Sequence, residues 1–286
     1  MGEGAGRPVD AGDAVVRALE AVAAELDATL GPALLDQPDG VHRHRKAVRR
    51  LRSTLSAYRP FFDDEAVRHL HRVYRDWGRE LGEVRDAEVR IAVTRRFLDV
   101  DEGSSADHRR LADLQRDHRS AERWVARRGT SLVAVRRRSD LADFLAAPPR
   151  TEKAHRPAAR SLRRRLVKEG ERVLRRAETA AAEPASLPAL HELRKAARRL
   201  RYATEAVTRP PVGLFGAKAP ALADSAERIH DLLGDHRDAI AFAESYASVD
   251  RPADSPAVRA RAVAAARLSA LPRAVEELRD ALARFR

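Results

Sequence analysis

The 286-residue sequence contains no cysteine, which excludes disulfide bonds and catalysis by a thiol. Aromatic residues make up only 5% of the chain, so few rings are available for stacking on bases. No apolar run approaches the roughly 20 residues of a transmembrane helix. The first residues, MGEGAGRPVDAGD, lack the apolar core of a secretory signal. A reducing cytoplasm is therefore the expected compartment, with no membrane partner.

Motifs of catalysis and metal binding are also missing. The sequence has no P-loop, no GxGxxG, no HExxH and no Ser-His-Asp arrangement to favour. The pairs His42/His44 and His69/His71 are spaced i,i+2, so the two rings of each pair point to different sides of a helix. No acidic cluster is typical of Mg²⁺ binding. We therefore predict a protein that is not an enzyme and needs no metal or cofactor.

Basic residues are abundant, and nearly all of them are arginine. The formal net charge is +12, and only five of the 55 basic residues are Lys. A GC-rich genome would raise the Arg and Ala content together, but it would not place the cations of a helix on one side. The planar fork of Arg pairs with phosphate through two parallel hydrogen bonds. A polyanion is therefore the expected class of ligand.

A cationic helix is predicted over residues 41–59, VHRHRKAVRRLRSTLSAYR. At about 100° per residue, Lys46 and Arg49 lie within roughly 40° of His42 on the helical wheel. Val, Leu and Tyr side chains collect on the opposite side, so one face can pack and the other is cationic and free of acids. Three more cations flank His42 within about 80°: Arg45, Arg50 and Arg52.

A second stretch, residues 190–207, repeats this pattern at a constant offset of 149. A further echo follows, because residues 81–87 (LGEVRDA) match residues 233–239 (LGDHRDA) at an offset of 152. Two matches in the same order indicate an internal duplication of about half the chain. The second copy of the cationic face carries His191, Arg194, Lys195, Arg198, Arg199, Leu200 and Arg201, followed by Tyr202.

Apolar residues recur at helical spacing, and no segment alternates as a strand would. The expected fold class is all-α, with two pseudo-symmetric helical bundles of about four or more helices each. Pro148-Pro149 marks the boundary between half 1, about residues 10–147, and half 2, about residues 151–286. Residues 1–9 are expected to be disordered.

The glycines of the two LGxxRDA segments allow two interpretations. Gly82 marks either a break between helices or a tight helix contact, and separate helices are expected to meet at Gly234. Arg85 and Arg237 follow within these segments. Each is either a ligand-binding residue or part of a helix junction.

Two related cationic faces favour a binding surface over a solvated exterior. Crowded cations repel one another unless a polyanion neutralises them. His42 and His191 lie in the first turn of the two faces. Neighbouring cations should lower the pKa of both imidazoles, and a bound phosphate should raise it again.

The two His-x-x-Arg-Lys-x-x-Arg-Arg-Leu-Arg motifs, in order with the LGxxRDA segments, resemble the CHAD domain, an α-helical domain named for its conserved histidines. The resemblance covers about residues 10–285. It implies two pseudo-symmetric bundles with a basic surface or pore between them, inorganic polyphosphate as ligand, and localisation to polyphosphate granules. The ExExK strand of the CYTH domain, often fused to this family, is absent. His44 stands where the second copy has Leu193, so we expect it in the core or an interface.

The resemblance assigns polyphosphate binding to both cationic faces and to the two LGxxRDA arginines. By extension, it includes three cations on the helix that precedes the second motif. The helix that precedes the first motif carries acids instead, so the expected site is asymmetric. The full predicted set is His42, Arg45, Lys46, Arg49, Arg50, Arg52, Arg85, Arg160, Arg164, Lys168, His191, Arg194, Lys195, Arg198, Arg199, Arg201, Tyr202 and Arg237.

Three alternatives to non-catalytic polyphosphate binding stay open at the level of sequence. The first is sequence-independent nucleic-acid binding, which is disfavoured because Tyr202 is the one aromatic residue among the face cations. The second is an enzyme acting on polyphosphate or nucleotides, with His42 or His191 as acid/base or phosphate carrier. The third is a scaffold whose cations meet an acidic partner protein.

Overall fold

The computed structural model describes residues 9–35, 37–97, 105–183, 186–216, 218–246 and 255–286. Regular secondary structure in these ranges is helical apart from two isolated β-bridges, which confirms the predicted all-α class. The short 3₁₀ turns η1 (Arg59–Phe61) and η2 (Glu152–His155) lie between longer helices. These are α1 (Ala11–Leu34), α2 (Gly40–Tyr58), α3 (Asp64–Phe97), α4 (Ser105–Gly129), α5 (Leu132–Ala146), α6 (Ala158–Ala182), α7 (Leu187–Thr208), α8 (Lys218–Tyr246), α9 (Pro256–Ser269) and α10 (Leu271–Phe285).

The start of the described chain is tied to the start of α6. The carbonyl of Val9 accepts a hydrogen bond from the N–H of Ala158 at 3.1 Å, and the N–H of Ala11 donates to the carbonyl of Arg156 at 2.9 Å. Residue 9 is thus part of the fold, and the expectation of disorder was wrong for it. Residues 1–8 lie outside the described residues.

Side-chain caps fix several helix starts. Asp10 accepts a hydrogen bond from the N–H of Asp13 at 2.7 Å at the beginning of α1. Ser131, Ser186 and Ser255 cap α5, α7 and α9 in the same way. Each cap satisfies one of the N–H groups that the first turn of a helix leaves unpaired.

Helices α3 and α8 are each continuous through their glycine, which corrects the expected break. α3 runs unbroken past Gly82 and α8 past Gly234. One glycine inside a helix costs only about 1 kcal/mol relative to alanine, and packing against neighbouring helices offsets this. At Gly82 a Cβ atom would make only an ordinary contact, 3.6 Å from Nη2 of Arg45, so no tight helix contact requires glycine there.

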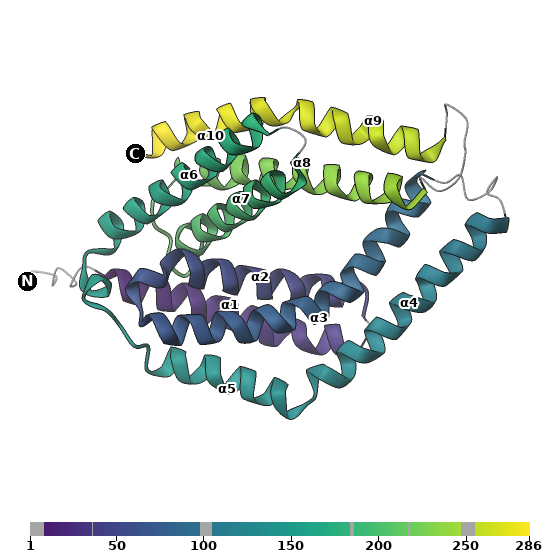
Figure 1. Ribbon diagram of the computed structural model, residues 1–286. Helices are drawn as coiled ribbons and strands as arrows, with labels where there is room; N and C mark the ends of the chain where they lie inside the picture. Colours follow the sequence, from purple (N-terminus) through teal and green to yellow (C-terminus); the bar gives the residue numbers. More distant parts are fainter. Residues whose placement is uncertain (1–8, 36, 98–104, 184–185, 217, 247–254) are drawn as a thin grey trace, which may run out of the picture.

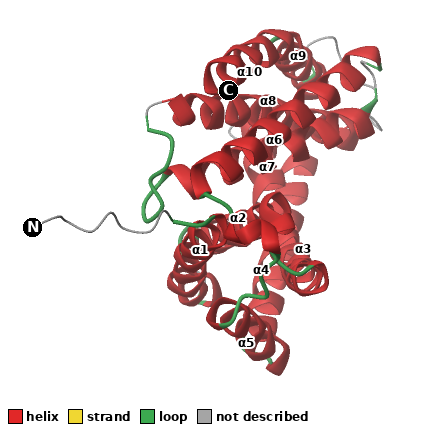
Figure 2. Cartoon of the chain, turned by 90° about the vertical axis from the view of Figure 1, so that its left-hand side faces the viewer, coloured by secondary structure: helices red, strands yellow, loops and turns green. Residues whose placement is uncertain are grey.

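The helices form two groups that meet along α2 and α7. α1 to α5 occupy the lower part of Figure 1, and α6 to α10 occupy the upper part. In the view turned by 90°, α6 and α7 lie directly above α1 and α2 (Figure 2). The C-terminal parts of α3 and α8 also contact each other. The two cationic helices are therefore at the junction of the groups.

One hydrophobic core extends through both groups. Leu51 of α2 and Leu200 of α7 are fully buried in it. The hydroxyl of Tyr58, also fully buried, donates to the carbonyl of Ala203 on α7 at 2.7 Å. None of the helices in the described ranges combines the length and apolarity needed to cross a bilayer.

Candidate functional site

The cationic sides of α2 and α7 converge with residues of α3 and α8. The apolar sides of both helices pack into the core, where Val48 of α2 and Ala197 of α7 are completely buried. The cations then lie close enough to influence one another's protonation across the junction. We call this set the central cluster: His42, Arg45, Arg49, Arg52, Arg85, Arg194, Arg198, His230 and Arg237.

Arg49 and Arg198 lie at the heart of the central cluster. Burial, and then the charges of Arg49 and Arg194, lower the pKa of Arg198 to about 10. No carboxylate in the described part of the chain lies within ion-pair distance of Arg49, Arg194 or Arg198. The Nε atoms of Arg49 and Arg194 are buried without a hydrogen-bond partner. Removing a charge from water without pairing it is costly, so this arrangement favours a bound anion.

Two glycines make room for the outer arginines of the central cluster. A Cβ atom on Gly82 would lie 3.6 Å from Nη2 of Arg45, and one on Gly234 would lie 3.3 Å from Nη2 of Arg194. The guanidinium groups therefore lie against bare backbone of α3 and α8. The glycine of each repeated LGxxRDA segment thus faces the arginine of the His-x-x-Arg motif on the neighbouring helix.

Histidines add titratable groups to this cationic environment. Burial lowers the pKa of the half-buried His42, and so do the charges of Arg85 and Arg49. The Nδ1 atom of His42 is buried without a hydrogen-bond partner. The exposed His191 also has a lowered pKa, through partial burial and then through Lys195. A neutral imidazole next to cations can take up a proton when an anion arrives.

His230 of α8 was not predicted from the sequence. Its pKa is lowered to about 2 by burial and then by Arg194 and Arg198, and its Nδ1 atom is buried without a hydrogen-bond partner. The available signal was its spacing, because His230 precedes Gly234 by four residues and so shares its helix face. The repeat hid this signal, since the matching position in the first half is Gly78.

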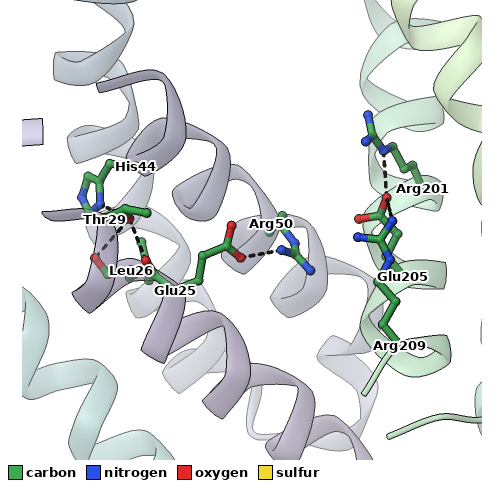
Figure 3. Close-up of polar contacts among 8 residues, drawn as sticks. All are labelled: Glu25, Leu26, Thr29, His44, Arg50, Arg201, Glu205 and Arg209. Atoms are coloured by element: carbon green, nitrogen blue, oxygen red, sulfur yellow. Dashed lines mark hydrogen bonds and ion pairs between the residues drawn. The ribbon is translucent and has the colours of Figure 1, made fainter. Parts of the chain in front are cut away.

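Several predicted ligands are already neutralised by carboxylates of the same helix or of a neighbouring one. Arg50 pairs with Glu25 of α1 at 2.5 Å, and Arg201 pairs with Glu205 at 3.0 Å, as Figure 3 shows. The others are Arg199 with Glu169 at 2.8 Å, Arg85 with Glu88 at 2.7 Å, Arg237 with Asp238 at 2.8 Å, and Lys195 with Glu192.

The sequence was also compared with known families and structures. The family model described as "CHAD domain" matches residues 16–247. The chain belongs to the CHAD domain family. A comparison with curated proteins gave no match.

Two solved structures resemble the whole chain. The crystal structure of the CHAD domain from the plant Ricinus communis has a TM-score of 0.69 and 21% identity, covering 98% of this chain and 95% of the other. PptA from Streptomyces chartreusis has a TM-score of 0.65 and 19% identity, covering 95% of this chain and 99% of the other. At these identities the likeness shows a shared fold.

Some predicted residues of this CHAD domain lie apart from the central cluster. Arg160, Arg164 and Lys168 are exposed on α6, and within the described ranges no hydrogen bond or ion pair joins them to the central cluster. Tyr202 is only 3% exposed, with the guanidinium of Arg201 5.4 Å from its ring centroid. Its ring is therefore not available for stacking on a base. Lys46 is half-buried on α2, with no ion pair in the described chain.

The edge of the central cluster opens into a small hollow of the CHAD domain between α7 and α8. This pocket has a volume of about 360 Å³ and is lined by apolar side chains together with His191, Arg194, His236, Arg237 and one carboxylate, Glu244. Among the described residues, no three His, Asp or Glu side chains gather as metal ligands. The arrangement is chemically suited to holding anionic oxygen atoms.

Proposed function

We propose that this CHAD domain binds inorganic polyphosphate without catalysing its turnover. The observation that carries the proposal is the proximity of the half-buried cations Arg49 and Arg198, which influence each other's protonation and have no carboxylate partner in the described chain. A string of phosphates lying along α2 and α7 would supply the missing negative charge. Arg forks would hold phosphate oxygens in pairs, and Lys46 would act as a point charge.

Histidine protonation fits the same ligand. Cationic neighbours help to keep His42 and His230 neutral in the free protein. Bound phosphate would raise both pKa values, because a nearby negative charge favours the imidazolium form. Each imidazolium would then donate further hydrogen bonds to the ligand.

Matching contacts in the two halves support the proposal that an internal duplication built two pseudo-symmetric bundles. Gly82 accommodates Arg45 in the first half, as Gly234 accommodates Arg194 in the second. The second arginine of each Arg-Arg-Leu run is also neutralised from the preceding helix, by Glu25 in one half and Glu169 in the other. A linear ligand would meet equivalent arginines from both halves.

Nucleic-acid binding is the main alternative at this surface. It lacks a stacking platform, since the one aromatic residue of the cationic faces is buried. Polyphosphate bound to the protein should therefore resist competition by duplex DNA at equal phosphate concentration. A turnover assay with and without Mg²⁺ tests the further alternative of an enzyme, and phosphate release that depends on His42 or His191 would contradict our proposal.

The double variant R49E/R198E tests the site. Each arginine offers charge-assisted hydrogen bonds of about 1.5–3 kcal/mol, so losing both should weaken polyphosphate binding at least about 100-fold. The measurement is calorimetric titration with polyphosphate, with circular dichroism to confirm intact helices. R17E/R261E is the matched control, because it changes the net charge equally at exposed positions of α1 and α9.

Unchanged affinity in folded R49E/R198E would contradict the assignment of the site. Equal weakening in the control would mean that total charge, and not the central cluster, determines binding. In cells, a fluorescent fusion of the wild type should collect on polyphosphate granules in the cytoplasm. The R49E/R198E fusion should stay diffuse.

A further inference from the structure

A second cavity lies away from the central cluster, between α1, α3 and α5. Its volume is about 550 Å³, within the range of about 300–1,000 Å³ that is usual for small-molecule sites. Its walls are largely apolar, with Leu26, Leu30, Leu141 and Leu145 among them. Arg137 and Arg138 of α5 also line it.

Arg137 is the unusual group in this cavity. Its side chain is only 6% exposed, and its Cζ atom lies 4.2 Å from the ring centroid of Trp77. No carboxylate or hydrogen-bond acceptor for its guanidinium occurs among the described residues. The nearby Glu80 is engaged by Arg128 at 3.0 Å. The indole ring stabilises the cation on one face, but no described residue accepts a hydrogen bond from the guanidinium of Arg137.

A chain of hydrogen bonds holds the Trp77 ring in place beneath this arginine. Trp77 Nε1 donates to His44 Nε2 at 3.0 Å. His44 Nδ1 lies 3.0 Å from the hydroxyl of Thr29, which itself donates to the carbonyl of Glu25 at 2.7 Å. His44 is therefore the neutral Nδ1–H tautomer, with both nitrogens used. These hydrogen bonds fix the orientation of the ring on which Arg137 lies.

The charges of the lining fit an anion with a single charge. Arg137 and Arg138 contribute two positive charges, Asp27 contributes one negative charge, and His44 is neutral. A phosphate dianion would need more donors than these walls offer, because most of the lining is hydrocarbon. A carboxylate needs only one guanidinium fork, and an apolar body can lie against the leucines.

We propose that this cavity binds a small organic monocarboxylate, with its carboxylate paired to Arg137 and its apolar body against the leucines of α1 and α5. The site is independent of the central cluster. It would make the protein responsive to an apolar acid as well as to a polyanion.

Octanoate is a suitable probe for calorimetric titration of the full chain. We expect one-to-one binding of octanoate and none of octanol at the same concentration. R137Q should weaken octanoate binding at least about tenfold, since a charge-assisted pair is lost. The matched control R136Q changes an exposed arginine one residue earlier on α5 and should bind octanoate as the wild type does.

A142F provides a second test that does not depend on Arg137. Ala142 lines the cavity but is exposed on α5, so a phenyl ring there should block the cavity without unfolding the helix. Loss of octanoate binding in A142F, with unchanged polyphosphate binding, would support the proposal. Absence of octanoate binding by the wild type, or equal binding by octanol, would overturn it. So would full binding by folded R137Q and A142F.

Discussion

Neighbouring arginines on one helical turn have opposite environments in this protein. Arg49 is half-buried without a carboxylate partner in the described chain, while Arg50 is held by Glu25 of α1. On α7, Arg198 has no such partner, while Arg199 pairs with Glu169. The paired arginine binds its own half together, and the unpaired one remains available to an anion. A single-residue shift around the helix thus separates an arginine paired within the protein from one with no carboxylate partner in the described chain.

His44 is a structural residue, as its departure from the repeat indicated. It is 3% exposed, and both ring nitrogens are hydrogen-bonded. Burial, and then the charge of Arg137, lower its pKa to about 4. Protonation would place an N–H opposite the N–H of Trp77. The folded state therefore resists taking up this proton.

We expect His44 to make the protein less stable as the pH falls from 6.5 to about 4. In this window the unfolded chain binds a proton that the folded state excludes. The free energy of unfolding should therefore fall, by about 3 kcal/mol in total from this residue. The measurement is urea unfolding at pH 7 and pH 4 for wild type and H44Q.

The H44Q variant isolates this contribution from the titration of carboxylates. At pH 7 the wild type should be the more stable protein, and its advantage should shrink by about 3 kcal/mol at pH 4. An advantage that is the same at both pH values would show that His44 does not titrate in this way.

At the scale of helices, glycines decide how closely neighbours approach. Gly82 and Gly234 face the ends of arginine side chains, whereas Gly170 of α6 faces the core. A Cβ atom on Gly170 would lie only 2.7 Å from Cδ1 of Leu282 on α10. Leu282 is buried and cannot move freely. The packing of α6 on α10 therefore requires glycine at this position.

G170A should destabilise the protein, and G82A should not. Alanine favours the helix by up to about 1 kcal/mol over glycine, and at Gly82 the new Cβ would make ordinary contact at 3.6 Å. G82A should therefore be neutral or slightly stabilising. G170A should cost about 1–3 kcal/mol through overpacking. Chemical denaturation of both variants checks this, and a G170A variant as stable as G82A would contradict the packing argument.

At the scale of the whole molecule, the central cluster exists because four helices from two groups converge. α2 and α3 supply one set of cations, and α7 and α8 supply the other. The continuous core holds the groups together, with the hydrogen bond from Tyr58 to the carbonyl of Ala203 crossing the junction. A ligand bound there would contact both groups at once.

Polyphosphate binding should weaken steeply with salt. Each phosphate neutralised contributes about −0.7 to the slope of log K against log salt for a single-stranded polyanion. R198Q should therefore make the slope shallower by about 0.7. The control R261Q, at an exposed position of α9, should leave the slope unchanged. Titrations at several salt concentrations give the slopes, and an unchanged slope in R198Q would place Arg198 outside the binding surface.

Much of the fold was predictable from the helical spacing of apolar residues and from the Pro and Gly residues between helices. Helical spacing of Val15, Leu19 and Leu26 predicted α1, and these side chains are buried. The break expected at Gly234 was wrong, as was the break that was one of two interpretations of Gly82, because local propensity is weaker than packing. The polar partners of the cations were not predictable, since Glu25 and Glu169 lie far from Arg50 and Arg199 in sequence.

The sequence by itself determined the helices, the one-sided cationic faces and the family, because these depend on residue type and spacing along the chain. The tertiary structure decided which cations keep an unsatisfied charge. It also decided that His230 joins the central cluster and that Arg137 is buried over Trp77. Charge pairing and burial depend on distances through space, and only the packing of distant segments sets those distances.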